Sequence, residues 1–219
     1  MSIPLISFLI TTHNEGKCLD KLLTRVCHES GDYPKEVIVV DDYSSDSTTL
    51  EILERFSKHG SVKVFKHALD SHYGNHKNYG NSQCNGKYIF QIDGDELPHE
   101  ILLFNLQSIL ESNTDVDLFH VPRRNKFIGM TNDDSKTWGW RVNEKGYVNW
   151  PDYQSRIYRN TPTIKWDRKL HETIVGMTKY SYIPDIEELS LYHEKTIEKQ
   201  RADNQRYVKN FSAEDNVRR

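Results

Sequence analysis

The chain has 219 residues, of which 36% are hydrophobic and 28% charged, and its formal net charge is −3. These values favour a single globular unit over a disordered segment and argue against a general affinity for polyanions. Its three cysteines are odd in number and lack CxxC spacing, which argues against a structural zinc site and favours reduced thiols. Because the longest apolar stretch near the start is too short to cross a bilayer, we expect a soluble, cytoplasmic protein.

The first half of the chain alternates short β-branched runs with helical patterns, which is typical of βαβ units around a mostly parallel sheet. The apolar runs lack alternation, as expected for strands covered on both faces. The sequence therefore predicts an α/β fold with strands at Leu5–Ile10, Glu36–Val40, Val62–Lys66 and Lys87–Ile92.

Three helices are predicted between and after these strands. The first buries one face, formed by Leu19, Leu22, Leu23 and Val26. The second begins near Asp46 or Ser47, where Thr48 and Glu51 have capping-box spacing, and it ends at Gly60 with a buried stripe of Leu50, Leu53 and Phe56. The third runs from Pro98 to about Leu110, with proline at its first position.

Composition divides the chain into three parts. Residues 1–122 carry the βαβ pattern, and residues 123–193 are aromatic-rich and irregular and are expected to form a second functional half of the same compact unit. Residues 194–219 are polar and rich in lysine and arginine, so we expect a docked helix with a frayed end.

Polar side chains follow three of the predicted strands, in the stretches Thr11–Glu15, Asp41–Asp46 and Asp93–Glu96. In open α/β sheets, ligands bind outside the carboxyl ends of the strands. We therefore expect these three stretches to meet at one ligand-binding edge.

The stretch Asp93-Gly94-Asp95 has two interpretations. Asp-Gly between apolar runs is a strong hairpin-turn signal, but here a helical pattern follows rather than a partner strand. We therefore prefer a metal site, in which the carboxylates hold a cation that stabilises the negative charge of a leaving diphosphate. Oxygen ligands favour Mg²⁺ or Mn²⁺, and an added imidazole favours Mn²⁺.

Asp41 and Asp42 also have two interpretations. They could cap the following helix, although Asp46 or Ser47 is better placed to do so. We prefer a role for Asp41 in accepting hydrogen bonds from a base or a ribose hydroxyl.

Three stretches, Ile6–Glu15, Val39–Thr48 and Gly86–Glu96, resemble in order and spacing the motifs of family 2 glycosyltransferases with the GT-A fold. The resemblance covers roughly the first half of the chain and is loose beyond it. It implies a Rossmann-like, mostly parallel central sheet flanked by helices, with a smaller acceptor-binding half. It also implies an inverting, metal-dependent enzyme that transfers a sugar from a UDP-sugar to a hydroxyl acceptor.

The resemblance assigns roles to residues of the first half. Thr11, His13 and Glu15 should line the uridine pocket and Asp41 should contact the uracil. Asp93 and Asp95 would be the DxD pair, with Asp95 the principal metal ligand. Lys77 stands where an arginine is more usual and should contact phosphate or base. The neighbouring Thr12, Asp42 and Gly94 complete the expected nucleotide-sugar site.

The second half should supply the catalytic base. By resemblance, Glu172 is the expected base and His171 a neighbour or sugar contact, whereas a structural glutamate on a helix surface is the alternative. His193 resembles the late histidine that completes the metal shell, although a histidine at a strand end is also commonly structural.

Two other functions remain open. A nucleotidyltransferase uses a similar fold but usually has a glycine-rich, basic loop after the first strand, whereas Thr11–Gly16 is acidic. A noncatalytic nucleotide-sugar-binding module is the second. The acceptor is also open: a glycan, a lipid carrier, a protein side chain or a hydroxymethylated DNA base each offers a hydroxyl, and a base would have to be flipped out and stacked.

Overall fold

The computed structural model describes residues 3–58, 60 and 62–216. The ends of the predicted first and last parts, residues 1–2 and 217–219, therefore lie outside the described residues. Within the described part of the chain, no helix combines the length and apolarity needed to cross a membrane.

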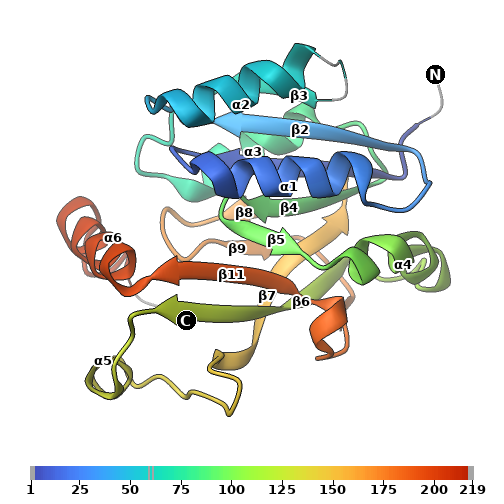
Figure 1. The fold of residues 1–219 in the computed structure, drawn as a ribbon. Coiled ribbons are helices and arrows are strands. Elements are labelled where there is room, and N and C mark those ends of the chain that lie inside the picture. The colour runs from blue at the N-terminus through green and yellow to red at the C-terminus, as the bar shows by residue number, and fades with distance from the viewer. Residues whose placement is uncertain (1–2, 59, 61, 217–219) are drawn as a thin grey trace.

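The first half builds the parallel part of the central sheet, as predicted. β1 (Ile6–Thr12), β2 (Lys35–Asp41), β3 (Val62–Lys66) and β4 (Tyr88–Asp93) lie in the order β3-β2-β1-β4, and all of these pairs are parallel. The connecting helices are α1 (Gly16–His28), α2 (Ser47–Lys58) and α3 (Tyr73–Gln83). Figure 1 shows α1 running alongside these strands, in front of the sheet.

The second half extends the same sheet with a different pattern. β7 (Val148–Arg159) pairs antiparallel with both β4 and β6 (Leu118–Ile128). β11 (Leu191–Thr196) and β10 (Tyr180–Tyr182) pair parallel with β6, and β5 (Glu96–Pro98) closes the sheet against β11. The α/β class is confirmed: the sheet is parallel from β3 to β4 and mixed from β7 onward.

The remaining elements surround this sheet. They are α4 (Glu100–Ser112), α5 (Asn132–Thr137), the small β8 (Lys165–Asp167) and β9 (Thr173–Val175) ribbon, a 3-10 turn (Glu187–Leu189) and α6 (Ile197–Asn210). β2, β6 and β11 all point towards the end of the molecule where α6 lies, and α4 lies at the opposite end (Figure 1).

Apolar clusters cover both faces of the sheet. One packs α1, α2 and α4 against Phe8, Phe90 and Ile157, and it contains all four residues predicted for the face of the first helix. The other packs the β8–β9 ribbon and the end of α3 against Leu9, Leu118 and related side chains. Burial on both faces explains why β1, β2 and β4 are largely apolar.

Several sequence predictions need correction. Pro98 ends β5 instead of starting a helix, and α4 begins at Glu100 with His99 as its cap. Asp46 caps α2 by accepting from Thr49 N, so the predicted Thr48–Glu51 capping box does not form the cap. Leu50 is exposed, because Thr49 and Ile52 occupy the buried face.

Two larger features of the structure also differ from the sequence predictions. The stretch after Pro122 is regular rather than irregular, since it contains most of β6 and all of β7. α3 was not predicted, because it buries mainly glycine, histidine and lysine and so carries no apolar stripe.

Candidate active site

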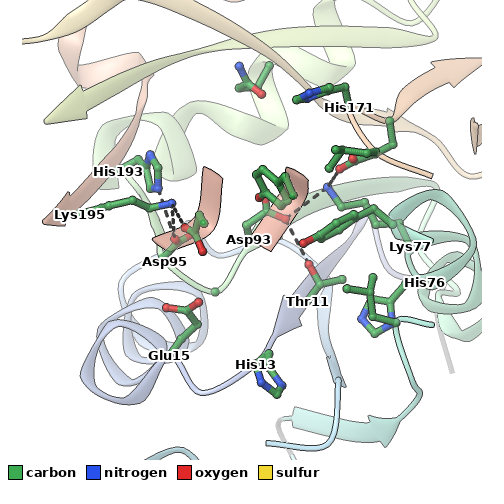
Figure 2. A pocket seen from close by; sticks show the side chains of 18 of the residues that line it. Thr11, His13, Glu15, His76, Lys77, Asp93, Asp95, His171, His193 and Lys195 are labelled. Atoms are coloured by element: carbon green, nitrogen blue, oxygen red, sulfur yellow. Dashed lines mark hydrogen bonds and ion pairs between the residues drawn. The ribbon is translucent and has the colours of Figure 1, made fainter. Parts of the chain in front are cut away.

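A cavity of about 1030 Å³ opens at the carboxyl ends of β1 and β4. Its walls come from the loops after these strands, from α3, β7 and β11, from the segment around β8 and β9, and from α6. Figure 2 shows Thr11, His13 and Glu15 on one side and His171 and His193 on the other. The structure thus brings both halves of the chain to one site.

Nearly all of the predicted site residues line this cavity. They are Thr11, Thr12, His13, Glu15, Asp42, Lys77, Asp93, Gly94, Asp95, His171, Glu172 and His193. Asp41 is the exception: it is fully buried, and its Oδ1 accepts a hydrogen bond from Ser44 N while Oδ2 has no partner. Its contact with a base stays a prediction, whereas Asp42 lies at the cavity and its Oδ1 accepts from Leu69 N.

Gly94 allows the ends of β1 and β4 to approach each other. A Cβ atom at this position would lie 2.9 Å from Thr12 Oγ1 and 3.1 Å from Glu15 Cγ. The Gly94 N–H donates to Thr11 O at 2.9 Å, which ties the two loops together. The turn interpretation of Asp93-Gly94-Asp95 is therefore correct for the backbone, but the strand that follows pairs with β11 and not with β4.

Asp95 and His193 form a pair at the cavity. His193 Nε2 lies 3.3 Å from Asp95 Oδ2, and its Nδ1 lies 2.9 Å from Asn125 Oδ1, which fixes the ring. Burial opposes the ionisation of Asp95, but the nearby His193 and Lys195 outweigh it and hold the pKa of this carboxyl well below its usual range. Asp95 is therefore anionic at neutral pH.

Asp93 faces a different set of partners. Its Oδ2 accepts from Arg156 at 2.6 Å, its Oδ1 lies 3.3 Å from Lys77 Nζ, and Thr11 Oγ1 donates to it at 3.2 Å. Burial raises the pKa of Asp93, but Arg156 and Lys77 outweigh this effect and bring it well below the usual value. Figure 2 shows Asp93 turned towards Lys77 and Asp95 turned towards His193.

The donor atoms present can be tested against a divalent cation. No group of three or more His, Cys, Asp or Glu side chains in the described ranges is arranged to hold a metal ion. The Asp95–His193 pair offers one carboxylate and one imidazole, a set that suits Mn²⁺ when a ligand's oxygens supply the remaining positions. The pair therefore fits, whereas the carboxylate of Asp93 is already neutralised by cations of the protein.

Glu172 is paired with Lys77 of α3. Lys77 is 2% exposed, donates to Glu172 Oε1 at 2.6 Å and lies 4.6 Å from the centre of the Trp166 ring. Burial raises the pKa of Glu172, but the ammonium of Lys77 outweighs it, so the pKa is below the ordinary value. The alternative of a surface glutamate on a helix does not apply, because Glu172 is partly buried, lies outside any helix and lines the cavity.

Strained backbone is concentrated around the cavity. Five of the seven non-glycine residues with positive φ in the described part of the chain line it: Asn14, Asp70, Ser71, Asn149 and His171. Such conformations cost free energy and tend to occur at functional sites. His171 has φ of 52° and its Nε2 lies 3.0 Å from Asn216 Oδ1.

Sequence reasoning missed the contribution of α6. Lys195 near the end of β11 and Lys199 and Arg206 of α6 line the cavity, and Lys199 Nζ donates to Glu15 Oε2 at 2.8 Å. Burial and then the charge of Asp95 raise the pKa of Glu15, which Lys199 offsets only in part. The only signal in the sequence was the basic character of residues 194–219, which does not show that these side chains face the site.

Two tryptophans, Trp140 and Trp166, line the cavity and differ in burial. Trp166 is buried, and its Nε1 donates to Tyr158 Oη at 2.9 Å. Trp140 is half-buried at the cavity wall and stacks on Phe127 with ring centres 4.5 Å apart.

Comparison with known proteins gives a family match. The family model described as "Glycosyl transferase family 2" matches residues 7–181. Glycosyltransferase AglE of Haloferax volcanii is 33% identical over 123 residues, which are 53% of this chain and 38% of that protein. Poly(ribitol-phosphate) beta-N-acetylglucosaminyltransferase TarP of Staphylococcus aureus is 32% identical over 119 residues, 51% of this chain and 35% of its own length. The chain thus matches little more than a third of either relative.

Solved structures show the same fold. The crystal structure of S. aureus TarS residues 1–349 in complex with UDP-GlcNAc has a TM-score of 0.63 at 21% identity, covering 87% of this chain and 58% of that one. The corresponding complex with UDP has a TM-score of 0.61 at 19% identity, covering 87% and 60%.

Proposed function

The chain belongs to glycosyl transferase family 2, and from that premise we propose that it transfers a sugar from a UDP-sugar to a hydroxyl acceptor with inversion at the anomeric carbon. The observation that carries the proposal is the cavity, which is lined by the residues that follow β1 and β4, by the Asp95–His193 pair and by Glu172. A UDP-sugar is the proposed donor because TarS, which has the same fold, binds UDP-GlcNAc.

Asp95 and His193 are the residues that would hold Mn²⁺ or Mg²⁺. Such an ion supplies Lewis-acid stabilisation of the negative charge on the leaving diphosphate. Asp93 has a different proposed role: paired with Arg156, it holds the end of β4 in place beneath the donor.

Cations of β11 and α6 are the proposed partners of the diphosphate. Lys195 Nζ and Lys199 Nζ each lie 3.9 Å from Asp95 Oδ2, and Arg206 lines the same wall. Charged donors aimed at the position where negative charge develops stabilise the transition state. We therefore assign Lys195 and Lys199 to diphosphate binding.

Glu172 is the proposed base. Its Oε1 accepts from Lys77, so Oε2 is the atom that would take the proton of the acceptor hydroxyl. An in-line attack needs this proton to be removed on the side opposite the leaving diphosphate. The lowered pKa of Glu172 keeps it deprotonated at neutral pH.

The proposal is tested by binding and turnover. UDP-GlcNAc and other UDP-sugars with Mn²⁺ or Mg²⁺ should raise the melting temperature, since a ligand that binds the folded state stabilises it. Acceptor-dependent release of UDP should follow, and Asp95→Ala should abolish the turnover that metal supports. If no UDP-sugar stabilises the protein with either metal, the proposal fails.

The same experiment separates the two alternatives. Release of pyrophosphate instead of UDP would identify a nucleotidyltransferase. Binding of a UDP-sugar without release of UDP under any acceptor condition would identify a noncatalytic binding module.

A further inference from the structure

Four aromatic side chains form a continuous cluster beside the cavity, which we call the aromatic platform: His120, Tyr153, Tyr180 and Tyr182. The ring centres of Tyr153 and Tyr182 are 4.8 Å apart, those of Tyr182 and His120 are 4.7 Å apart, and those of His120 and Tyr180 are 5.4 Å apart. Tyr153 lines the cavity, whereas Tyr182 is 52% and Tyr180 56% exposed. The platform therefore leads from the cavity into solvent.

Strand pairing places the platform on the cavity face of the sheet. Tyr180 pairs with Leu118, Tyr182 with His120, and His120 with Ser155, so these side chains share one face. Leu118 belongs to the apolar cluster of α3 and the β8–β9 ribbon, the elements that carry Lys77 and Trp166 to the cavity. The platform thus extends the cavity along the same face.

The platform has the chemistry of a binding surface. Exposed aromatic residues that gather in one place are more typical of an interaction site than of packing. Tyrosine combines a flat apolar ring with a hydroxyl, and Ser155 Oγ lies 3.2 Å from His120 Nδ1 at the cavity side. Flat faces with polar edges match a pyranose ring, which presents C–H bonds on its face and hydroxyls at its rim.

Charge argues against a polyanion on this surface. Residues 179–188 carry one lysine and three acids, Asp185, Glu187 and Glu188. The cations beside them are already in ion pairs, Lys179 with Asp115 and Arg124 with Glu187. Nucleic acid binding depends on cations that neutralise phosphates, so a neutral ring system fits the platform better than DNA does.

We propose that the aromatic platform is an acceptor subsite that stacks the sugar rings of an oligosaccharide, so that the acceptor is a glycan. The proposal rests on the proposed function, since it concerns the second substrate of the same cavity. Its position predicts that the ring receiving the new sugar lies inside the cavity and that the following rings lie on Tyr182 and Tyr180.

The test compares short and long acceptors. The probes are glucose, galactose and N-acetylglucosamine, their β-linked tetrasaccharides, a duplex with hydroxymethylated bases and a serine peptide. The variants are the double substitution Tyr180→Ala with Tyr182→Ala, the matching double substitution to Phe, and Phe104→Ala. Phe104 is 75% exposed on α4, which packs on the other face of the sheet, and is the control. Hydrolysis of the UDP-sugar without acceptor is measured in parallel.

We expect the KM of at least one tetrasaccharide to lie about tenfold or more below that of its monosaccharide, since aromatic contacts dominate many binding interfaces. The double alanine variant should lose this advantage, while the phenylalanine variant and Phe104→Ala keep it. Hydrolysis of the UDP-sugar should stay within about twofold in all variants, because none of the substituted residues lines the cavity.

Other outcomes contradict the proposal in distinguishable ways. Three results would overturn the glycan subsite: modification of the duplex or peptide alone, failure of every saccharide to act as acceptor, or a tetrasaccharide advantage that survives in the double alanine variant. In each case, hydrolysis of the UDP-sugar would still support the proposed function. Absence of all UDP release would overturn both. A wild-type dimer that the double alanine variant converts to monomer in sedimentation would show instead that the platform binds a second copy of the chain.

Discussion

Lys77 connects two carboxylates that the sequence places far apart. It donates to Glu172 at 2.6 Å and lies 3.3 Å from Asp93, and it is almost completely buried. A buried ammonium needs partners of opposite charge, because desolvation of an unpaired ion is costly. Lys77 therefore positions Glu172 and Asp93 as well as neutralising them, and its contact with phosphate or base stays a prediction.

Replacement of Glu172 by glutamine tests the assignment of the base. Glu172→Gln should retain UDP-sugar binding, because the amide fills the same space, and should lower kcat by about 10²–10⁴, the usual contribution of a general base. The measurement is steady-state UDP release with calorimetric binding of the donor. Near-normal turnover would remove Glu172 from the mechanism, and Glu188→Gln, an exposed glutamate near the platform, is the control.

The pH dependence of activity follows from the same pair. The pKa of Glu172 lies below the ordinary glutamate pKa of 4.5, so this base stays deprotonated above pH 4.5. The fall in kcat/KM at acid pH that its protonation causes should therefore lie below pH 4.5. The stability that the Lys77–Glu172 pair contributes is likewise present above that value and lost as the pH falls through the lowered pKa.

Removal of the cation should reverse this shift. In Lys77→Met the burial of Glu172 is no longer opposed by Lys77, so the acid limb should move to higher pH. The exposed Lys87→Met is the matched control and should leave the profile unchanged. An acid limb at the same pH in Lys77→Met and wild type would show that another group controls it.

Helix α6 is held to the rest of the molecule by few apolar contacts. Ile197 is its buried anchor at one end, and at the other Phe211 stacks on Tyr73 of α3 with ring centres 6.1 Å apart. Between these anchors the helix presents Lys199, Asp203 and Arg206 to the cavity. Elements with few apolar contacts open locally at low free-energy cost, so α6 forms a wall that can loosen without global unfolding.

Truncation of the outer anchor tests this behaviour. Phe211→Ala should speed amide hydrogen exchange across residues 197–210 and raise the KM for the UDP-sugar several-fold, with little change in melting temperature. Val208→Ala on the same helix is the control, because Val208 is 74% exposed. Unchanged exchange in Phe211→Ala would show that the charged contacts alone hold the helix.

The two halves of the molecule are joined by one buried polar network. Arg156 of β7 donates to Asp93, to Gln91 Oε1 and to Glu96 Oε1, each at 2.6 Å, and burial of this arginine is balanced by the two carboxylates that raise its pKa. Arg123 of β6 binds the same Glu96 at 2.8 Å. The expected boundary at residue 122 falls inside β6, so the sheet runs through both halves without a break.

Breaking this network should destabilise the whole chain. Arg156→Ala leaves the buried Glu96 and Asp93 short of a cation, and loss of one partner of a buried ion pair typically costs about 3–5 kcal/mol. Arg159→Ala, three residues along the strand, removes a more exposed pair with Asp117 and should cost about 0–1 kcal/mol. Urea unfolding measures both, and equal effects would show that burial of the network contributes nothing.

The sequence by itself determined the parallel half of the fold. The apolar runs and the helix periodicity between them follow from local rules, so all four predicted strands overlap the observed ones, and Val62–Lys66 matches throughout. The placement of Asp93 and Asp95 at the end of β4 follows in the same way, because the carboxyl ends of parallel strands meet at one edge of a sheet.

Only the tertiary structure decided which of these charges act together. Asp93 and Asp95 are two residues apart, yet one faces Arg156 of β7 and the other His193 of β11. Those partners are about 60 and 100 residues away along the chain, and their approach depends on the antiparallel pairing of β7 and the return of β11, for which no local pattern exists. Pairing between distant strands is a property of the packed sheet, and so is the chemistry of the site.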